Sequence, residues 1–299
     1  MMKSANWQEF LLPTLRKIFD KHIGQKKDFV PVIYSIESST KAQEFMHGIG
    51  SMGEMDKWSD TGNQVSYETI DKGFKATWTH DKWSKGLRIE KELLEDALYP
   101  EVKNRTKKLA DSVYYTRQRH AAMPFNNCLT VLGPDGKALA ATDHPIGPGS
   151  SETWSNYKTG MPLNEDSLEE IRNLMMEWTD DKGNEILIEP DTLIVPRRLR
   201  KAALTVADTD KKPDSAENNV NIWHGAVKVI EWDFLKDSNT WFFVDSNRMN
   251  QYMIWFERRK ATLAADKEDF DSEVAKYKVV GRWSFGPAET SFFYACRQH

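Results

Sequence analysis

The sequence predicts an α+β fold, and the distribution of apolar residues along the chain is the main reason. Helical spacing of apolar residues marks the N-terminal segment and the middle of the chain, whereas most of the last third shows short strand-like runs. The span 191–286 is rich in aromatic and β-branched residues but contains no recognisable catalytic constellation. We therefore expect a structural building block rather than an enzyme.

Composition limits the function classes further. The chain has 299 residues, of which 39% are hydrophobic, enough for one large domain or two modest ones. A formal net charge of -4 argues against a dedicated nucleic-acid-binding protein. The two cysteines, Cys128 and Cys296, form neither a disulfide framework nor a zinc motif. Since the N-terminus lacks an apolar signal core and no run of 18 apolar residues occurs, we expect a cytoplasmic chain that does not span a membrane.

The N-terminal segment predicts an amphipathic helix that needs a partner to cover its apolar face. The helix is expected between the candidate cap Ser4 and Gly24, with an interruption near Pro13. Its apolar residues recur at spacings of three and four: Trp7, Phe10, Leu11, Leu15, Ile18, Phe19 and Ile23. Residues 29–36 are expected to be extended, with Pro31 restricting them to an edge or irregular strand.

Two polar-aromatic runs, 65–70 and 74–80, predict a β-hairpin with its turn at residues 71–73. A two-stranded ribbon is marginal alone, so we expect a neighbouring subunit to cover it. Residues 40–47 look helical. The following segment 48–53 matches G-x-G-x-x-G but lacks the preceding strand and following helix of a dinucleotide site. We interpret Gly48 as a helix-ending glycine and the rest as a flexible hinge.

The middle of the chain predicts helices at 85–99 and, after Pro100, at 101–122, the second about 33 Å long at roughly 1.5 Å per residue. Residues 132–161 predict a long surface excursion because Gly, Pro, Ser and Asn are frequent there. Asn164 is the expected cap of the next helix.

Short strands and one basic helix complete the expected elements. The helix spans 196–207 and precedes a polar loop at 208–221. The expected strands are 186–188, 192–195, 226–232, 241–244, 274–280 and 291–294.

Several short segments in a fixed order carry a family resemblance over nearly the whole chain. They are 86–90, 117–120, 125–127, 135–139, 141–145, 190–196, 218–219, 232–233, 241–246, 270–271, 274–277 and 282–286. The series resembles the Mu-like major head subunits of tailed bacteriophages, whose shells are built from the Hong Kong 97 phage capsid fold. No single segment is diagnostic, but the ordered series is much more specific than a short catalytic motif.

The resemblance implies an arm at residues 1–45, an extended β-hairpin loop at 46–84, a peripheral domain with a long spine helix at 85–130 and 268–299, and an axial α/β domain at 131–267. It implies a major capsid protein that self-assembles in the host cell cytoplasm into hexamers and pentamers of an icosahedral shell. That shell, the virion capsid, encloses double-stranded DNA.

The implied partners are further copies of the chain, a scaffold protein, a portal and a maturation protease, with a decoration protein and non-specific contact with packaged DNA as additional interactions. We expect no catalytic residue, no cofactor, no metal and no membrane. The candidate inter-subunit residues are Trp7, Phe10, Leu11, Trp58, Tyr67, Phe74, Trp78 and Trp83. The hinge candidates are Gly48, Gly50 and Gly53, and shell expansion during DNA packaging would use them.

Two other classes remain open from the sequence. One is an α/β enzyme that uses the loop around Asp143 and His144, which would be a small soluble oligomer with a polar pocket. The other is a non-shell virion protein such as a decoration or adaptor module, which would need a preformed particle. The charge run 257–260 is interpreted as solvated, with contact to DNA or an acidic partner as the alternative.

Overall fold

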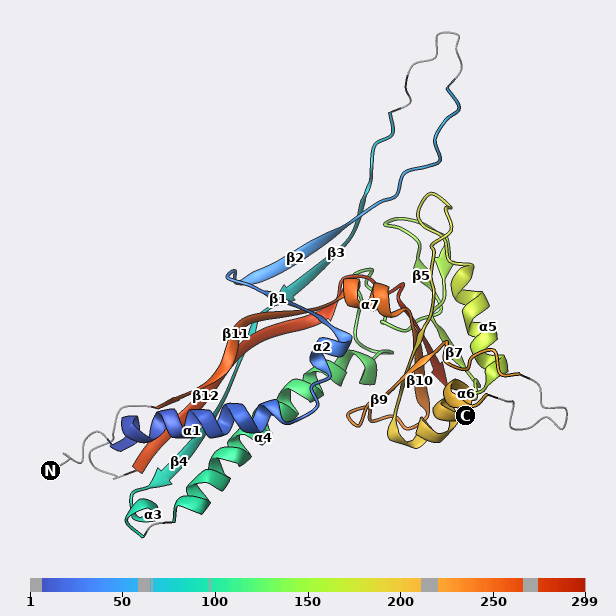
Figure 1. The fold of residues 1–299 in the computed structure, drawn as a ribbon. Coiled ribbons are helices and arrows are strands. Elements are labelled where there is room, and N and C mark those ends of the chain that lie inside the picture. The colour runs from blue at the N-terminus through green and yellow to red at the C-terminus, as the bar shows by residue number, and fades with distance from the viewer. Residues whose placement is uncertain are drawn as a thin grey trace. The chain divides into compact units, whose positions relative to one another are not determined.

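A computed structural model describes residues 7–58, 65, 67–96, 98–210, 220–265 and 274–298 of the chain (Figure 1). Contacts divide it into two compact units, each assembled from segments distant in sequence. The first unit comprises Met1–Glu44, Trp78–Ala121 and Trp255–Phe285. The second comprises Phe45–Thr77, Ala122–Ile254 and Gly286–His299.

The first unit is a four-stranded sheet with helices packed on one face. The strand order is β1 (Ser35–Ser38), β11 (Met253–Ala265), β12 (Val274–Pro287) and β4 (Asp81–Glu90), and the helices are α1 (Trp7–Gly24), α2 (Val30–Ile33), α3 (Glu92–Glu95) and α4 (Tyr99–Asn126). The apolar sides of α1 and α4 share one core with the sheet, which includes Phe19, Leu109 and Ile89. Five elements, β2 (Gln43–Ile49), β3 (Lys72–Thr79), α4, β11 and β12, have residues in both units.

Strand β12 pairs with β4 in antiparallel register. The burial pattern along β12 indicates which of its side chains face the helices. Ala275, Tyr277 and Val279 are buried in the core beneath α1 and α4. Because side chains of a strand alternate between faces, Lys276 and Lys278 lie on the face away from the helices. The strand predicted at 274–280 is confirmed, and it continues to Pro287.

The second unit contains a five-stranded mixed sheet in the order β7 (Tyr157–Thr159), β13 (Phe293–Arg297), β10 (Thr240–Val244), β8 (Thr192–Val195) and β9 (Lys228–Glu231). Around it lie α5 (Glu165–Met176), the 3-10 turn η2 (Arg197–Leu199), α6 (Arg200–Asp208) and α7 (Ser246–Tyr252). Two small ribbons pair β2 (Gln43–Ile49) with β3 (Lys72–Thr79) and β5 (His144–Pro145) with β6 (Thr153–Trp154).

Helix α5 begins as the sequence predicts. The Asn164 side chain accepts a hydrogen bond of 2.8 Å from the Ser167 amide, which satisfies a backbone donor at the helix start. Leu168, Ile171 and Met175 are fully buried in the core of the second unit. The long helix α4 is also confirmed, with 28 residues.

Several predictions near the N-terminus were wrong. Pro13 lies within a continuous α1, so it does not interrupt the helix. Residues 30–33 form α2 rather than a strand, because Pro31 occupies the first turn, where its missing N–H is not needed. The expected helix at 40–47 is largely strand β2. Strand β3 pairs with β2 rather than with 65–70, where the described residues form no strand.

Further along the chain, residues 85–90 belong to β4 rather than to a helix. The described residues 186–188 form no strand, although Ile188 is buried. The 132–161 segment has buried anchors, including Leu139 and Asn156, as well as surface loops. Strand β11 was not predicted, because the charged run 257–260 in its middle resembles a solvated segment.

The compact units differ from the domain boundaries implied by the resemblance. Residues 78–84 of the implied loop lie in the first unit. Residues 286–299 lie in the second unit, because β13 pairs with β10 along five residue pairs. The assignment of capsid domain names to these units stays a prediction.

Candidate functional site

The segment between residues 45 and 70 exposes large apolar side chains to solvent. It carries the end of β2 and the 50–71 loop that leads to β3 (Figure 1). Met55 is 98% exposed, Tyr67 92% and Trp58 64%. The exposed large apolar residues described here are Phe45, Met46, Ile49, Met52, Met55, Trp58, Val65, Tyr67 and Ile70. Such a concentration indicates an interaction surface rather than scattered surface residues.

The two strands of the ribbon approach each other closely at a pair of glycines. A Cβ added at Gly73 would lie 2.8 Å from the carbonyl carbon of Gly48. At Gly50, an added Cβ would lie 2.8 Å from Oδ2 of Asp181 and 2.9 Å from the carbonyl oxygen of Asp71. Close backbone packing therefore accounts for glycine at 48 and 50. The role of Gly48, Gly50 and Gly53 as a hinge stays a prediction.

Hydrogen bonds attach the start of the 50–71 loop to the 180–184 turn that follows α5. The Ser51 amide donates to Oδ1 of Asp181 at 2.9 Å, and Nδ2 of Asn184 donates to the carbonyl oxygen of Met52 at 3.1 Å. Asp180 braces the turn by accepting hydrogen bonds from two backbone amides within it. The loop is therefore fastened at its base by polar contacts.

An ion pair fastens the returning part of the same loop. Nζ of Lys182 lies 2.7 Å from Oε1 of Glu68, and the Gly53 amide donates to Oε2 at 2.9 Å. These two hydrogen bonds lower the pKa of Glu68, and the carboxylate raises the pKa of Lys182. One carboxylate thus links both sides of the loop to the turn.

The candidate inter-subunit residues occupy several environments. Trp58 and Tyr67 lie in the exposed segment, and Phe74 is half-buried in β3. Trp83 on β4 is 37% exposed and lies 4.4 Å, between ring centroids, from His120 of α4. Leu11 is partly buried against the core beneath α1. The side chains of Trp7 and Phe10 lie outside the described residues.

Trp78 occupies a core position within the first unit. It is 5% exposed, and its ring packs edge-on against Phe256 of β11 at a centroid distance of 5.3 Å. A side chain buried this way stabilises the subunit and has little surface left for a neighbour. Ala76 is buried two residues earlier, as expected for one face of a strand.

His144, the centre of the enzyme hypothesis, is a buried structural residue. Its Nδ1 lies 2.5 Å from Oδ2 of Asp135 and its Nε2 lies 3.1 Å from Oδ1 of Asn156. The ring stacks on Trp154 at 4.7 Å. Asp143 points elsewhere and pairs with Lys137. Because both ring nitrogens have partners and the side chain is inaccessible, this arrangement offers no acid or base to a substrate.

The remaining reactive groups also have structural environments. Cys128 and Cys296 are buried free thiols; burial raises the pKa of Cys128 to about 11 and that of Cys296 well above its usual value. Thiols in such surroundings are unreactive. Among the residues described, no cluster of His, Cys, Asp or Glu has the arrangement of a metal site. Within the same part of the chain, every helix is too short or too polar to span a bilayer.

The chain is similar to known proteins in its fold, although its sequence identity to the solved structures is low. A family model described as phage capsid protein matches residues 75–296. No curated protein matches the sequence.

Solved capsid structures are similar over most of their length. The mature capsid of bacteriophage PhiM1 matches with a TM-score of 0.58 at 11% identity, covering 92% of this chain and 88% of that one. The procapsid of bacteriophage JBD30 matches with a TM-score of 0.52 at 12% identity, covering 97% and 76%. The decorated JBD30 capsid, which carries minor capsid protein trimers, matches with a TM-score of 0.55 at 15% identity, covering 72% and 93%.

Proposed function

We infer a structural function from one premise: the chain belongs to the phage capsid protein family. It is a capsid component and not an enzyme. Its α+β fold is that of Hong Kong 97-type capsid subunits, as the similarity over most of the chain indicates. We propose that it is the major capsid protein of a tailed phage and that its copies form the icosahedral shell of the virion.

The exposed apolar segment is the observation that supports this proposal most directly. A fully buried aromatic side chain removes 150 to 250 Å² from water, worth roughly 4 to 6 kcal/mol before the costs of association. Trp58 and Tyr67 leave most of that area exposed in the single chain. Further copies of the chain would cover them, as repeated contacts in a closed shell require.

The finer assignments follow from the resemblance of the sequence to Mu-like head subunits. We propose that the shell consists of hexamers and pentamers and that the arm and the 50–71 loop reach over neighbouring copies. The boundaries 1–45, 46–84, 85–130 with 268–299, and 131–267 remain the proposed arm, loop, peripheral and axial regions. A scaffold, a portal and a maturation protease are the proposed assembly partners, with non-specific contact to packaged DNA.

Two further proposals concern mature particles. Gly48, Gly50 and Gly53 would form the hinge that changes the angle of the loop when the shell expands. A decoration protein is a proposed partner because the related JBD30 capsid carries minor capsid protein trimers. Comparison of the loop angle in empty precursors and filled particles would test the hinge, and identical angles would reject it.

Electron microscopy and sedimentation of the overexpressed protein test the main proposal. We expect closed, uniform shells or capsomers from the wild-type chain. A double variant, Trp58→Ser with Tyr67→Ser, should remain as folded, unassembled subunits. Leu187→Ser is a matched control, because Leu187 is 90% exposed in the second unit but lies outside the exposed segment.

Other outcomes would point to the alternatives. A small, stable oligomer that never forms shells or capsomers under any assembly condition would contradict the major capsid function. Binding only to preformed particles would indicate a decoration module instead.

A further inference from the structure

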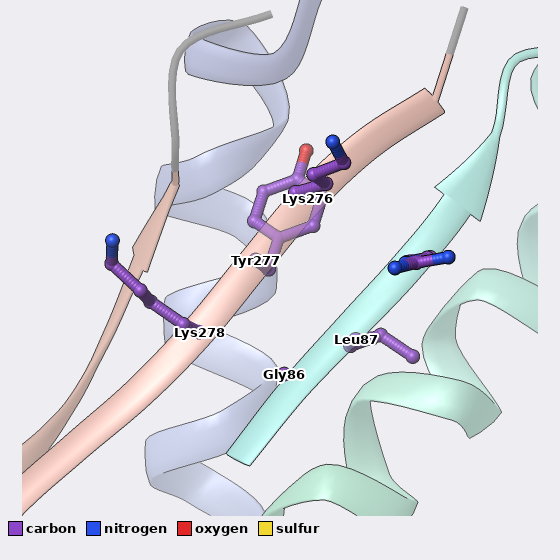
Figure 2. Close-up of a pocket in the computed structure, with 6 residues that line it drawn as sticks. Gly86, Leu87, Lys276, Tyr277 and Lys278 are labelled. Carbon is purple, nitrogen blue, oxygen red and sulfur yellow. The ribbon is translucent and has the colours of Figure 1, made fainter. Parts of the chain in front are cut away.

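A buried histidine, His80, connects three segments of the first unit. It lies between β3 and β4, and β4 in turn pairs with β12 (Figure 2). His80 is 4% exposed, and the ring of Phe256 on β11 lies 6.1 Å from it between centroids. Nε2 lies 2.9 Å from Oγ of Ser39, which follows β1, and Nδ1 lies 2.9 Å from Oγ of Ser284 on β12. One ring therefore joins the 39–44 turn, which leads from β1 into β2, to the sheet.

The hydrogen bonds of Ser39 determine which ring nitrogen carries the proton. Hydrogen bonds from Ser39 and Lys41 lower the pKa of Glu44, which keeps this carboxyl group ionised. Ser39 Oγ therefore donates its only proton to Oε1 of Glu44, at 2.8 Å, and can only accept from the histidine. Nε2 of His80 is then the donor, and Nδ1 of the neutral ring accepts from the Ser284 hydroxyl.

The 39–44 turn has little else to hold it by its side chains. Among residues 36–43, all of which are described, only Ser39 is buried. The other side-chain contacts of the turn are exposed: Lys41 pairs with Glu44, and Nε2 of Gln43 donates to Oγ1 of Thr79 at 3.1 Å. Exposed contacts of this kind contribute little free energy. The buried contact between Ser39 and the histidine is therefore the main side-chain attachment of the turn.

The charges around the ring oppose its protonation. Arg258 of β11 and Arg282 of β12 both act on His80, and Nε of Arg282 donates to the His80 carbonyl oxygen at 3.2 Å. Lys82 pairs with Arg282 and adds a further cation. Glu44 has the opposite effect, but it is already paired within the turn. Burial, followed by the two arginines, lowers the pKa of His80.

A second proton on the ring also disrupts the hydrogen bonds. Protonation makes Nδ1 a donor, so Ser284 has to turn its hydroxyl group and accept instead. The hydroxyl proton of Ser284 then needs another acceptor, whereas within the described part of the chain His80 is its only hydrogen-bond partner. A buried charge beside two arginines is costly as well. The charged ring is therefore more stable in water, which it reaches once the turn moves away.

We propose that His80 is a pH-sensitive latch, which holds the 39–44 turn on the sheet while the ring is neutral and releases the turn when the ring is protonated. Because Glu44 is the second residue of β2, release also loosens the start of that strand. The released state binds the proton more readily, so the latch is closed above about pH 6.5 and opens progressively as the pH falls below that value. The latch goes beyond the proposed function and does not depend on assembly.

Hydrogen–deuterium exchange of the full chain, resolved by peptide, tests the latch. The Lys41 amide donates to Ser39 Oγ and so reports the opening of the turn. Exchange is compared at about pH 7.5 and about pH 5.5 and corrected for its intrinsic pH dependence. Protection of the 39–44 peptide should fall severalfold at the lower pH, and by at most about tenfold, because release takes up one proton. Peptides of α4 should keep their protection.

Three variants separate the latch from a general loss of stability. His80→Gln removes the titrating group, so protection of the turn should no longer depend on pH. Arg258→Gln should raise the pKa of His80 and shrink the loss of protection; Nη1 of Arg258 is buried without a hydrogen-bond partner among the described residues, so no acceptor is left unpaired there. His120→Gln is the matched control: burial also lowers the pKa of this histidine of the first unit, but it interacts with Asp81 and Trp83 rather than with the turn.

The outcomes are distinct from those of the assembly experiment. Equal protection of the turn at both pH values would overturn the latch, and so would a pH dependence that persists in His80→Gln or disappears in His120→Gln. An equal loss of protection throughout the first unit would assign the effect to global unfolding and would also overturn it. None of these results bears on the proposed function, which is tested by the formation of shells or capsomers.

Discussion

Two tryptophans in and near the ribbon should respond in opposite ways to truncation. Trp58 is 64% exposed on the 50–71 loop, whereas Trp78 is 5% exposed and packs against Phe256. Trp58→Ala therefore removes surface that a neighbour would cover, and Trp78→Ala removes part of the subunit core. The pair separates assembly from folding.

The magnitudes follow from the exposed fractions. A buried Trp replaced by Ala costs about 3 to 5 kcal/mol of unfolding free energy, because the cavity is only partly filled by relaxation. The Trp58 side chain has an area near 200 Å², and about two-thirds of it is exposed to solvent. Covering that exposed part is worth roughly 3 kcal/mol per contact, before the costs of association, at about 25 cal/mol/Å². Its loss should change the subunit's unfolding free energy by less than about 0.5 kcal/mol.

Urea unfolding of dilute subunits and light scattering during assembly measure the two effects. We expect Trp78→Ala to lower the urea midpoint clearly and Trp58→Ala to leave it unchanged. In the assembly assay, Trp58→Ala should shift the onset to higher protein concentration. Equal destabilisation of the subunit by both variants would refute the distinction, as would normal assembly of Trp58→Ala.

Three further outcomes are expected. Burial and two neighbouring arginines lower the pKa of His80 in the folded subunit. The unfolded chain therefore binds the proton more readily, so the unfolding free energy should fall as the pH drops below about 6.5. His80→Gln should flatten that part of the pH profile of urea unfolding. Lys182→Met should speed proteolysis within the 50–71 loop without a clear change in the urea midpoint of the subunit, whereas Lys158→Met, which removes another surface ion pair, should not change the cleavage rate. Gly50→Ala should lower the melting temperature, since its Cβ would lie 2.8 Å from a carboxylate oxygen, whereas Gly53→Ala, with its nearest neighbour at 3.5 Å, should not; equal shifts would contradict the close-approach argument.

Elements with a local signal could be predicted from the sequence. Helix α5 has its cap, Asn164, and its apolar spacing within one short window. The buried strands β8 and β10 are continuous apolar runs, so their strand character is also local. In each case neighbouring residues determine the structure.

Elements whose partners are distant in sequence could not be predicted. Residues 40–47 show helical spacing, but their backbone pairs in part with β3, across the 50–71 loop. Strand β11 contains the charged run 257–260 between two apolar stretches, and its strand structure depends on pairing with its neighbours in the sheet, β1 and β12. Tertiary context overrode local propensity at both positions.

The candidate surface was only partly predictable. The aromatic content of the sequence predicted Trp58, Tyr67 and Trp78 as inter-subunit residues. Trp58 and Tyr67 are exposed, whereas Trp78 is buried. Met52 and Met55 were missed, because methionine is usually a core residue. The signal that could have found them is the absence of any apolar periodicity across 50–71, where methionines alternate irregularly with charged and small residues.

The contacts that hold the 50–71 loop also affect how a neighbouring copy could bind it. Its described contacts with the 180–184 turn are hydrogen bonds and one ion pair, including those of Ser51 and Glu68. Exposed polar contacts of this kind contribute little free energy each, and water can replace them when the loop moves. If apolar packing held the base of the loop, the apolar side chains that are now exposed would be buried within the subunit. Polar attachment therefore orients the loop while leaving its apolar residues exposed, and the proposed change in loop angle would break only contacts of this kind.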